Sequence, residues 1–203
     1  MRSFLVIVAA LLLTAFHGRE VHNGVLVHRL IVQPNSKLTI DGRTNVNQFQ
    51  CATTYYSRND TLVLVEGKAR RPFFEKGYVG LEATSFDCGV QLMTADFAKT
   101  IKAKEHPAIF IEFISFERVP DYQQREDKFK GKMKISLAGV AKVFQMDCSI
   151  KVQPGGQIHL MGGRDFTFAD FDLEAPKRMM GLIKVEDELK VNFHLVLLLD
   201  RHG

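Results

Sequence analysis

The sequence predicts an all-β protein in which about eight antiparallel strands close into a barrel, accompanied by one or two short helices. From Val25 onward, runs of alternating non-polar and polar residues are separated by turn residues such as Pro34 and Asn35. The side chains of a strand alternate between its two faces, so each run makes one apolar wall and one wet wall. Their even spacing and short connections favour an antiparallel barrel, which leaves no open sheet edge.

The last predicted strand shows the alternation most clearly. One of its faces is entirely non-polar, whereas the opposite face begins with Lys190, Asn192 and His194. Two earlier runs repeat the pattern, and the three together predict an apolar lumen lined by Ile109, Ile111, Phe113, Met133, Ile135, Leu137, Leu189, Val191, Phe193 and Leu195. An eight-stranded barrel can hold a small ligand or be filled by its own side chains, and the pattern alone does not decide between the two.

Composition argues against several classes of function. A chain of 203 residues fits one domain, and its net charge of +4, with no nucleic-acid-binding motif, does not favour a nucleic-acid partner. The histidines and cysteines lack the spacing of metal ligands, so no metal is expected. No motif of a serine or cysteine nucleophile occurs, and the carboxylates Asp165, Asp170 and Asp172 are more typical of turns, so we do not expect an enzyme.

The N-terminus is typical of a signal peptide. Arg2 precedes a non-polar run over residues 4–16, which is too short for a comfortable transmembrane helix. We therefore expect residues 1–18 to direct export, with an uncertain cleavage site, and residues 19–203 to form one barrel domain. The expected location is periplasmic or secreted; the alternative is an uncleaved membrane anchor.

Export would place the three cysteines in an oxidising compartment, where disulfides persist. Cys51 and Cys88 lie in similar strand-like segments, so we favour a disulfide between them. Cys148 is then an inert, unpaired residue. The alternative is three buried free thiols.

A helix is expected over residues 94–103, with Thr94 as its N-cap. Met93, Phe97 and Ile101 recur at helical spacing and make a candidate lid over the lumen; the alternative is a helix that simply packs on the barrel end. The strand that follows is non-polar on both faces, with Phe110, Ile114 and Phe116 on the second. That second face needs a cover, which a helix, a loop or a homodimer partner would provide.

Two basic features allow functional and ordinary interpretations. Lys128, Lys130, Lys132 and Lys134 alternate along one strand, where they would attract anionic head groups or form a solvated face that blocks edge pairing. A predicted loop carries a second basic cluster, Lys68, Arg70 and Arg71, followed by Phe73 and Phe74. This loop is either the mouth of the barrel, in contact with a membrane surface, or an ordinary exposed loop.

Four blocks of the chain occur in the order KLTIDGRTNVNQFQC, LEATSFDCGVQLMTADFAKTIKAKEHPAIFIEF, GKMKISLAGVAKVFQMDC and FTFADFDLEAPKRMMGLIKVEDELKVNFHLVL. Together they span residues 37–198 and resemble the YceI family of bacterial lipocalin-like polyisoprenoid-binding proteins, in its Bacteroidetes-type branch. Pro107, Ile109 and Ile111 match the family's P-x-I-x-F turn, with Ile111 where Phe is usual. The family's opening Trp is missing, and QLMTADFAKT replaces the RDxHL motif of the better-known branch.

The resemblance implies an exported, eight-stranded antiparallel lipocalin-like barrel that holds isoprenoid chains such as ubiquinone or polyprenyl phosphates and has no agreed catalytic residues. We therefore expect a carrier or storage protein for a long apolar lipid, with no other cofactor. The alternatives are a filled-barrel structural or stress protein acting through a dimer interface, and an enzyme on a small hydrophobic substrate.

Overall fold

The computed structural model describes residues 21–22, 25–67 and 70–200, so the predicted signal peptide over residues 1–18 lies outside the described residues. The helical elements are α1 (Gln91–Thr100) and the 3-10 turns η1 (Ala83–Ser85), η2 (Phe168–Phe171) and η3 (Met179–Gly181). The strands are β1 (Val21–His22), β2 (Val25–Val32), β3 (Lys37–Arg43), β4 (Gln48–Thr53), β5 (Thr61–Gly67), β6 (Arg70–Lys76), β7 (Tyr78–Glu82), β8 (Phe86–Asp87), β9 (Ala108–Phe116), β10 (Asp127–Leu137), β11 (Val140–Val152), β12 (Gln157–Thr167), β13 (Lys177–Arg178), β14 (Ile183–Lys184) and β15 (Glu188–Leu199).

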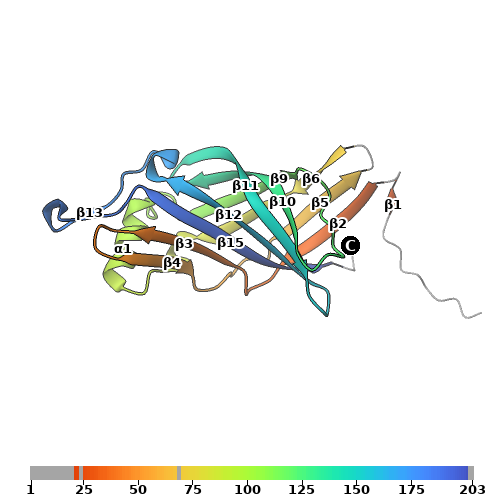
Figure 1. Cartoon of the computed structure of the whole chain (residues 1–203), viewed down its shortest axis with the longest axis horizontal. Helices are drawn as coiled ribbons and strands as arrows, with labels where there is room; N and C mark the ends of the chain where they lie inside the picture. The colour runs from red at the N-terminus through yellow and green to blue at the C-terminus, as the bar shows by residue number, and fades with distance from the viewer. Residues whose placement is uncertain (1–20, 23–24, 68–69, 201–203) are drawn as a thin grey trace, which may run out of the picture.

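The strands close into an eight-stranded antiparallel barrel, as the sequence predicts (Figure 1). Closure is made by β2, which pairs with β5 on one side and with β15 on the other. β2 and β3 run in the same direction along β15, so they act as one long strand broken at residues 33–36. β4 and β5 form a second broken strand beside it. Near one end of the barrel β4 pairs with the short β8, and α1 follows directly.

A β-bulge changes which side chains of β9 face the core. Met133 of β10 pairs with Phe113, but the preceding Lys132 pairs with Ser115, so Ile114 is an extra residue in β9. An extra residue reverses the alternation beyond it. Phe116 is therefore buried in the core and does not share an outer face with Phe110 and Ile114, which corrects the strict alternation expected from the sequence.

The helix begins earlier than the sequence suggests. α1 starts at Gln91 with Val90 as its N-cap residue, and Thr94 lies inside its first turns. The Thr94 hydroxyl accepts a hydrogen bond from the Cys88 N–H at 3.0 Å. Thr94 therefore stabilises the turn that precedes the helix, although it lies inside the helix. Gly89, at φ +76°, makes the preceding turn, a conformation that glycine adopts without steric cost.

Candidate functional site

An apolar cavity of about 290 Å³ occupies the end of the barrel where α1 lies. It is lined by the first half of β15, by β3, β4, β9 and β10, by α1 and η2, and by residues of the segment that carries β13 and β14. Its volume is near the lower end of the range of about 300–1,000 Å³ that is usual for small-molecule sites. The lining is almost wholly non-polar, so the cavity is suited to a hydrocarbon chain.

Most of the predicted lumen residues line this cavity, but not all of them. The lining includes Ile109, Ile111, Ile135, Leu137, Leu189, Val191 and Phe193. Phe113, Met133 and Leu195 lie outside the lining and are at most 3% exposed, packed in the other half of the barrel. The lumen is therefore divided along the barrel axis into a hollow part and a solid part.

Aromatic rings fill the solid part. Phe74 lies 5.4 Å from Phe113 and 5.0 Å from Phe116 between ring centroids, and Phe116 lies 4.7 Å from Phe129. Phe113 also meets the ring of Phe193, which forms the floor of the cavity. The sequence leaves open whether the lumen is a ligand cavity or a filled core. The barrel has both, a cavity in one half and a filled core in the other.

Many lining residues lie outside the set predicted from the sequence. Leu38 and Ile40 of β3 contribute to it, and their alternation with polar residues is visible in the sequence. Three phenylalanines of the closing block also contribute, Phe166, Phe168 and Phe171. Phe168 and Phe171 lie in the 3-10 turn η2, which interrupts the strand periodicity, so counting alternate positions does not identify them as lining residues.

The three candidate lid residues, Met93, Phe97 and Ile101, all line the cavity from α1. Ile101 is 4% exposed, and the ring of Phe97 packs on Phe86 with centroids 5.0 Å apart. The helix therefore forms one wall of the cavity as well as packing on the barrel end.

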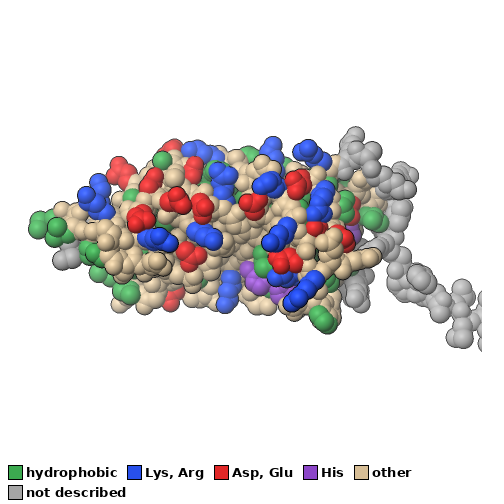
Figure 2. Space-filling model, in the orientation of Figure 1, with side chains coloured by type: hydrophobic (Ala, Val, Ile, Leu, Met, Phe, Trp, Pro, Cys, Tyr) green, Lys and Arg blue, Asp and Glu red, His purple; other side chains and the backbone are tan. Residues whose placement is uncertain are grey.

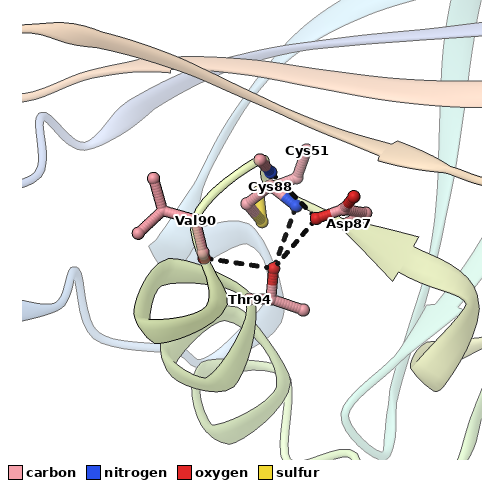
Figure 3. Close-up of a disulfide and its surroundings, with 6 residues drawn as sticks. Cys51, Asp87, Cys88, Val90 and Thr94 are labelled. Atoms are coloured by element: carbon pink, nitrogen blue, oxygen red, sulfur yellow. Dashed lines mark hydrogen bonds between the residues drawn. A yellow bond between two sulfur atoms is a disulfide. The ribbon is translucent and has the colours of Figure 1, made fainter.

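A disulfide between Cys51 and Cys88 attaches this helix to the barrel wall (Figure 3). Cys51 belongs to β4 and lines the cavity, while Cys88 lies two residues before the N-cap of α1. The Asp87 carboxylate accepts the Gly89 N–H at 2.9 Å and the Thr94 hydroxyl at 3.3 Å. The start of α1 is thereby fixed covalently and by hydrogen bonds. Cys148 is a free, buried thiol, and its burial raises its pKa to about 12.

The few polar lining residues include Thr44, Asn47, Asp96 and Thr100, all near the helix and the β3–β4 turn. Asp96 is the only charged residue in the described lining, which contains no Lys, Arg or His. The described lining thus offers hydroxyl and amide groups to the polar end of a ligand, and no cation.

The alternating lysines lie on the outer wall, away from the cavity. Lys130 forms an ion pair with Asp147 at 2.6 Å, and Lys134 forms one with Glu112. Hydrogen bonding to these carboxylates raises the pKa of both lysines. These contacts fit the interpretation of the strand as a solvated outer face.

The basic aromatic segment does not mark the cavity mouth. The end of β5 and the start of β6 lie at the opposite end of the barrel from α1 (Figure 1), and Lys68 is outside the described residues. Arg71 and Phe73 are exposed, whereas Phe74 turns inward onto Phe113 and Phe116. Residues 70–76 form strand β6, which corrects the loop expected there.

His159 and His194 make a pair on the outer wall, with Nδ1 and Nε2 2.7 Å apart, and burial lowers the pKa of His194. Within residues 21–22, 25–67 and 70–200, no group of three or more His, Cys, Asp or Glu side chains is placed to bind a metal ion.

Among the same described residues, no helix has the length and non-polar character needed to span a membrane.

Solved structures share this architecture. A polyisoprenoid-binding domain from Saccharophagus degradans, implicated in plant cell wall breakdown, superposes with a TM-score of 0.61 at 12% identity, covering 84% of this chain and 98% of its own. BcnA of Burkholderia cenocepacia gives 0.54 at 18% identity, covering 79% and 95%. A mutant YceI protein of Campylobacter jejuni gives 0.53 at 19% identity, covering 74% and 84%.

The chain has the YceI fold. At these identities the YceI structures establish the shared fold alone. No protein-family model matches the sequence, and no curated protein matches it.

Proposed function

We propose that this protein is a YceI-type lipid-binding barrel that holds an isoprenoid chain in the cavity beside α1, as an exported carrier or storage protein. The observation that carries the proposal is the apolar cavity enclosed by β3, β9, β10, β15 and α1. A superposable domain whose described role is polyisoprenoid binding supports the ligand class.

The driving force is the removal of hydrocarbon from water. An isoprenoid tail has no hydrogen-bonding groups, and burying each methylene contributes about 0.8 kcal/mol. Ile111, Ile135 and Val191 line the cavity and offer branched non-polar surface to such a tail, and Asp96 is the one charged residue of the described lining. Binding on this model needs no catalytic residue and no chemical change in the ligand.

The division of the barrel limits how much of the ligand is held. A cavity of about 290 Å³ ends at Phe193, whose ring packs on the buried ring of Phe113. A long isoprenoid therefore places one section of its chain inside. Affinity should rise with chain length while the cavity fills and then level off.

The lining favours an uncharged polar end. A phosphate or pyrophosphate placed near the helix would find no cation among the described lining residues. Burying an unpaired charge in such a place is costly, whereas a quinone ring or a hydroxyl can be hydrogen-bonded by Thr100 or Asn47. We therefore propose a quinone-type or alcohol-type isoprenoid in preference to a polyprenyl phosphate.

Export is part of the proposal. Residues 1–18 have the composition of a signal peptide, and the Cys51–Cys88 disulfide suits an oxidising compartment such as the periplasm or the exterior. Sequencing the N-terminus of the protein recovered from the producing cell tests this point. Recovery of an intact Met1 from the cytosol would contradict it.

The decisive experiment is native mass spectrometry of freshly purified protein, followed by organic extraction and identification of any bound lipid. Delipidated protein is then titrated with ubiquinone, polyprenol and polyprenyl phosphate of matched chain length. The proposal expects a co-purifying isoprenoid and tighter binding of the two uncharged lipids. A bare protein that takes up none of the three would overturn it, and preference for the phosphate would overturn the head-group assignment.

A further inference from the structure

The most exposed large non-polar side chains gather at one end of the molecule. In the described residues, six such side chains are more than half exposed, and five of them lie at the end of the molecule that holds the cavity: Val46, Val90, Leu92, Met180 and Leu182. Met180 is fully exposed and Leu182 is 70% exposed. Isolated exposed non-polar residues are normal, but a cluster of them marks an interaction surface.

Three structural elements carry these five side chains, which together are called the rim. Val90 and Leu92 belong to the start of α1, and Val46 to the turn between β3 and β4. Met180 and Leu182 lie between β13 and β14, in a hairpin that projects beyond the end of the barrel (Figure 1). In the space-filling view, green non-polar side chains lie at the tip of this end, with blue and red side chains next to them (Figure 2).

The hairpin is held in its projecting position by the β3–β4 turn. The Asn45 side chain donates to the Leu182 carbonyl at 2.9 Å and accepts the Lys184 N–H at 3.0 Å. Thr44 and Val185 form an isolated antiparallel bridge beside them. These contacts use backbone groups of the hairpin, and they leave the Leu182 side chain turned to solvent.

The hairpin is also cationic. Residues 176–185 include Lys177, Arg178 and Lys184 and contain no Asp or Glu. Lys177 and Lys184 are exposed and flank the non-polar tip. Non-polar residues that enter the head-group boundary, flanked by lysines that meet anionic lipid, are the combination used by proteins that lie on a bilayer surface.

The rim is continuous with the cavity. Val46, Val90 and Leu92 are exposed at the rim and also line the interior. A lipid that passes along them from a bilayer into the cavity does not have to expose its chain to water, which would be unfavourable. Val27 and Phe73 are also exposed, but they lie on the outer wall at the opposite end, in the strands on either side of Val65. They do not line the cavity, and this distinguishes them from the rim.

We propose that this rim docks on an anionic lipid bilayer, with Met180 and Leu182 entering the head-group boundary and Lys177 and Lys184 contacting anionic head groups. The proposal rests on the lipid-binding function above and adds the surface from which the ligand enters. It assigns membrane contact to the end opposite the basic aromatic strand β6.

The test is co-sedimentation of the full mature protein with vesicles of phosphatidylcholine alone or mixed with phosphatidylglycerol. Wild-type protein should bind the mixed vesicles and lose affinity as salt rises, because salt screens the lysines. Met180→Asp with Leu182→Asp should weaken binding at least about tenfold, since charged side chains are excluded from the boundary. Lys177→Gln with Lys184→Gln should weaken it by about fivefold per lysine.

The matched control is Val27→Asp with Phe73→Asp, which changes two exposed non-polar residues at the other end. It should bind vesicles as wild type does. Failure of wild-type protein to bind either vesicle, or equal binding by the Met180 and Leu182 variant, would overturn the proposal. So would loss of binding in the control alone.

Uptake of ubiquinone delivered from a water-miscible solvent is measured in parallel on every variant. Normal uptake without vesicle binding would overturn the docking surface and leave the lipid-binding function standing. Vesicle binding without uptake would overturn the function and, with it, the role of the rim as an entry route.

Discussion

The rings of Phe113 and Phe193 meet edge to face, with centroids 5.6 Å apart, and this contact separates the hollow half of the barrel from the filled half. Phe193 lines the cavity, whereas Phe113 does not. Gly162 makes the arrangement possible, because a Cβ atom there would lie 2.3 Å from the Phe193 ring. The depth of the cavity is therefore determined by two aromatic residues and a glycine.

A bulky substitution should act differently in the two halves. Ile135→Trp points into the cavity, so we expect it to abolish isoprenoid uptake at a cost below about 1 kcal/mol in unfolding free energy. Leu195→Trp overpacks the filled half and should cost about 1–3 kcal/mol. Both variants introduce the same indole N–H, so its burial cost affects the two comparably. Denaturant unfolding and ligand titration provide the measurements, and equal stability losses would contradict a barrel divided in this way.

The sequence was sufficient to predict the barrel and most of one cavity wall. The alternation of Leu189, Val191 and Phe193 with polar neighbours identified an inward face, and β15 presents that face to the lumen. Alternation cannot indicate how far along the barrel the lumen is hollow, because the inward residues of both halves are equally non-polar. Phe113 and Ile111 look equivalent in the sequence and lie in different halves.

Local irregularities account for the remaining differences. Strict alternation in the sequence places Phe116 on the wrong face, because no glycine or proline marks the bulge at Ile114. Thr94 resembled an N-cap, but Gly89 and Asp87 turn the chain early enough for the helix to start at Gln91. The bulge depends on pairing with a neighbouring strand, and the helix start depends on side-chain contacts with the preceding turn; single-residue preferences encode neither.

The disulfide should contribute substantially to stability. Cys51 and Cys88 are 37 residues apart in sequence, and closing a loop of this length contributes about 4 kcal/mol in the chain-entropy model. We expect Cys51→Ala with Cys88→Ala to lower the unfolding free energy by about that amount and to speed ligand release, because the start of α1 loses its covalent attachment to β4.

Reducing agent provides the internal control for this prediction. Dithiothreitol should destabilise wild-type protein and leave the double variant unchanged. Cys148, whose burial raises its pKa to about 12, should not react with thiol reagents at pH 8 until the protein unfolds. If wild-type protein and the double variant unfold at the same denaturant concentration without reductant, the bond does not stabilise the barrel.

Asp127 should make the protein sensitive to acid. Its buried carboxylate accepts hydrogen bonds from Arg118 at 2.7 and 2.5 Å and from the Asp121 N–H at 2.7 Å. Hydrogen bonding to Arg118 lowers the pKa of Asp127 to about 2. Since the folded pKa lies below the unfolded value of about 3.9, the stabilisation is present above that value and is lost as pH falls from about 4 to 2.

Asp127→Asn should therefore lower the unfolding free energy at pH 7 by about 2 kcal/mol, or less because water screens the half-exposed Arg118. Its stability should also fall less steeply between pH 4 and 2 than that of wild type. Asp147→Asn is the control, because this carboxylate is exposed and its pair with Lys130 should contribute little. Identical acid unfolding of wild type and Asp127→Asn would rule out the role of Asp127.

Removing the cavity floor should lengthen the site. Phe193→Ala deletes the ring between the hollow and filled halves, so the cavity should extend toward Phe113. The cost should be about 3–5 kcal/mol, as is usual for truncating a buried phenylalanine. Phe129→Ala is the matched control, because it truncates a buried ring that packs on Phe116 and does not line the cavity. Isoprenoids of increasing length are titrated into wild type and both variants. The chain length at which affinity levels off should be longer in Phe193→Ala than in wild type, and unchanged in Phe129→Ala. A shift of the same size in Phe129→Ala would show that general loosening of the core, and not the position of the floor, determines the chain length that is held.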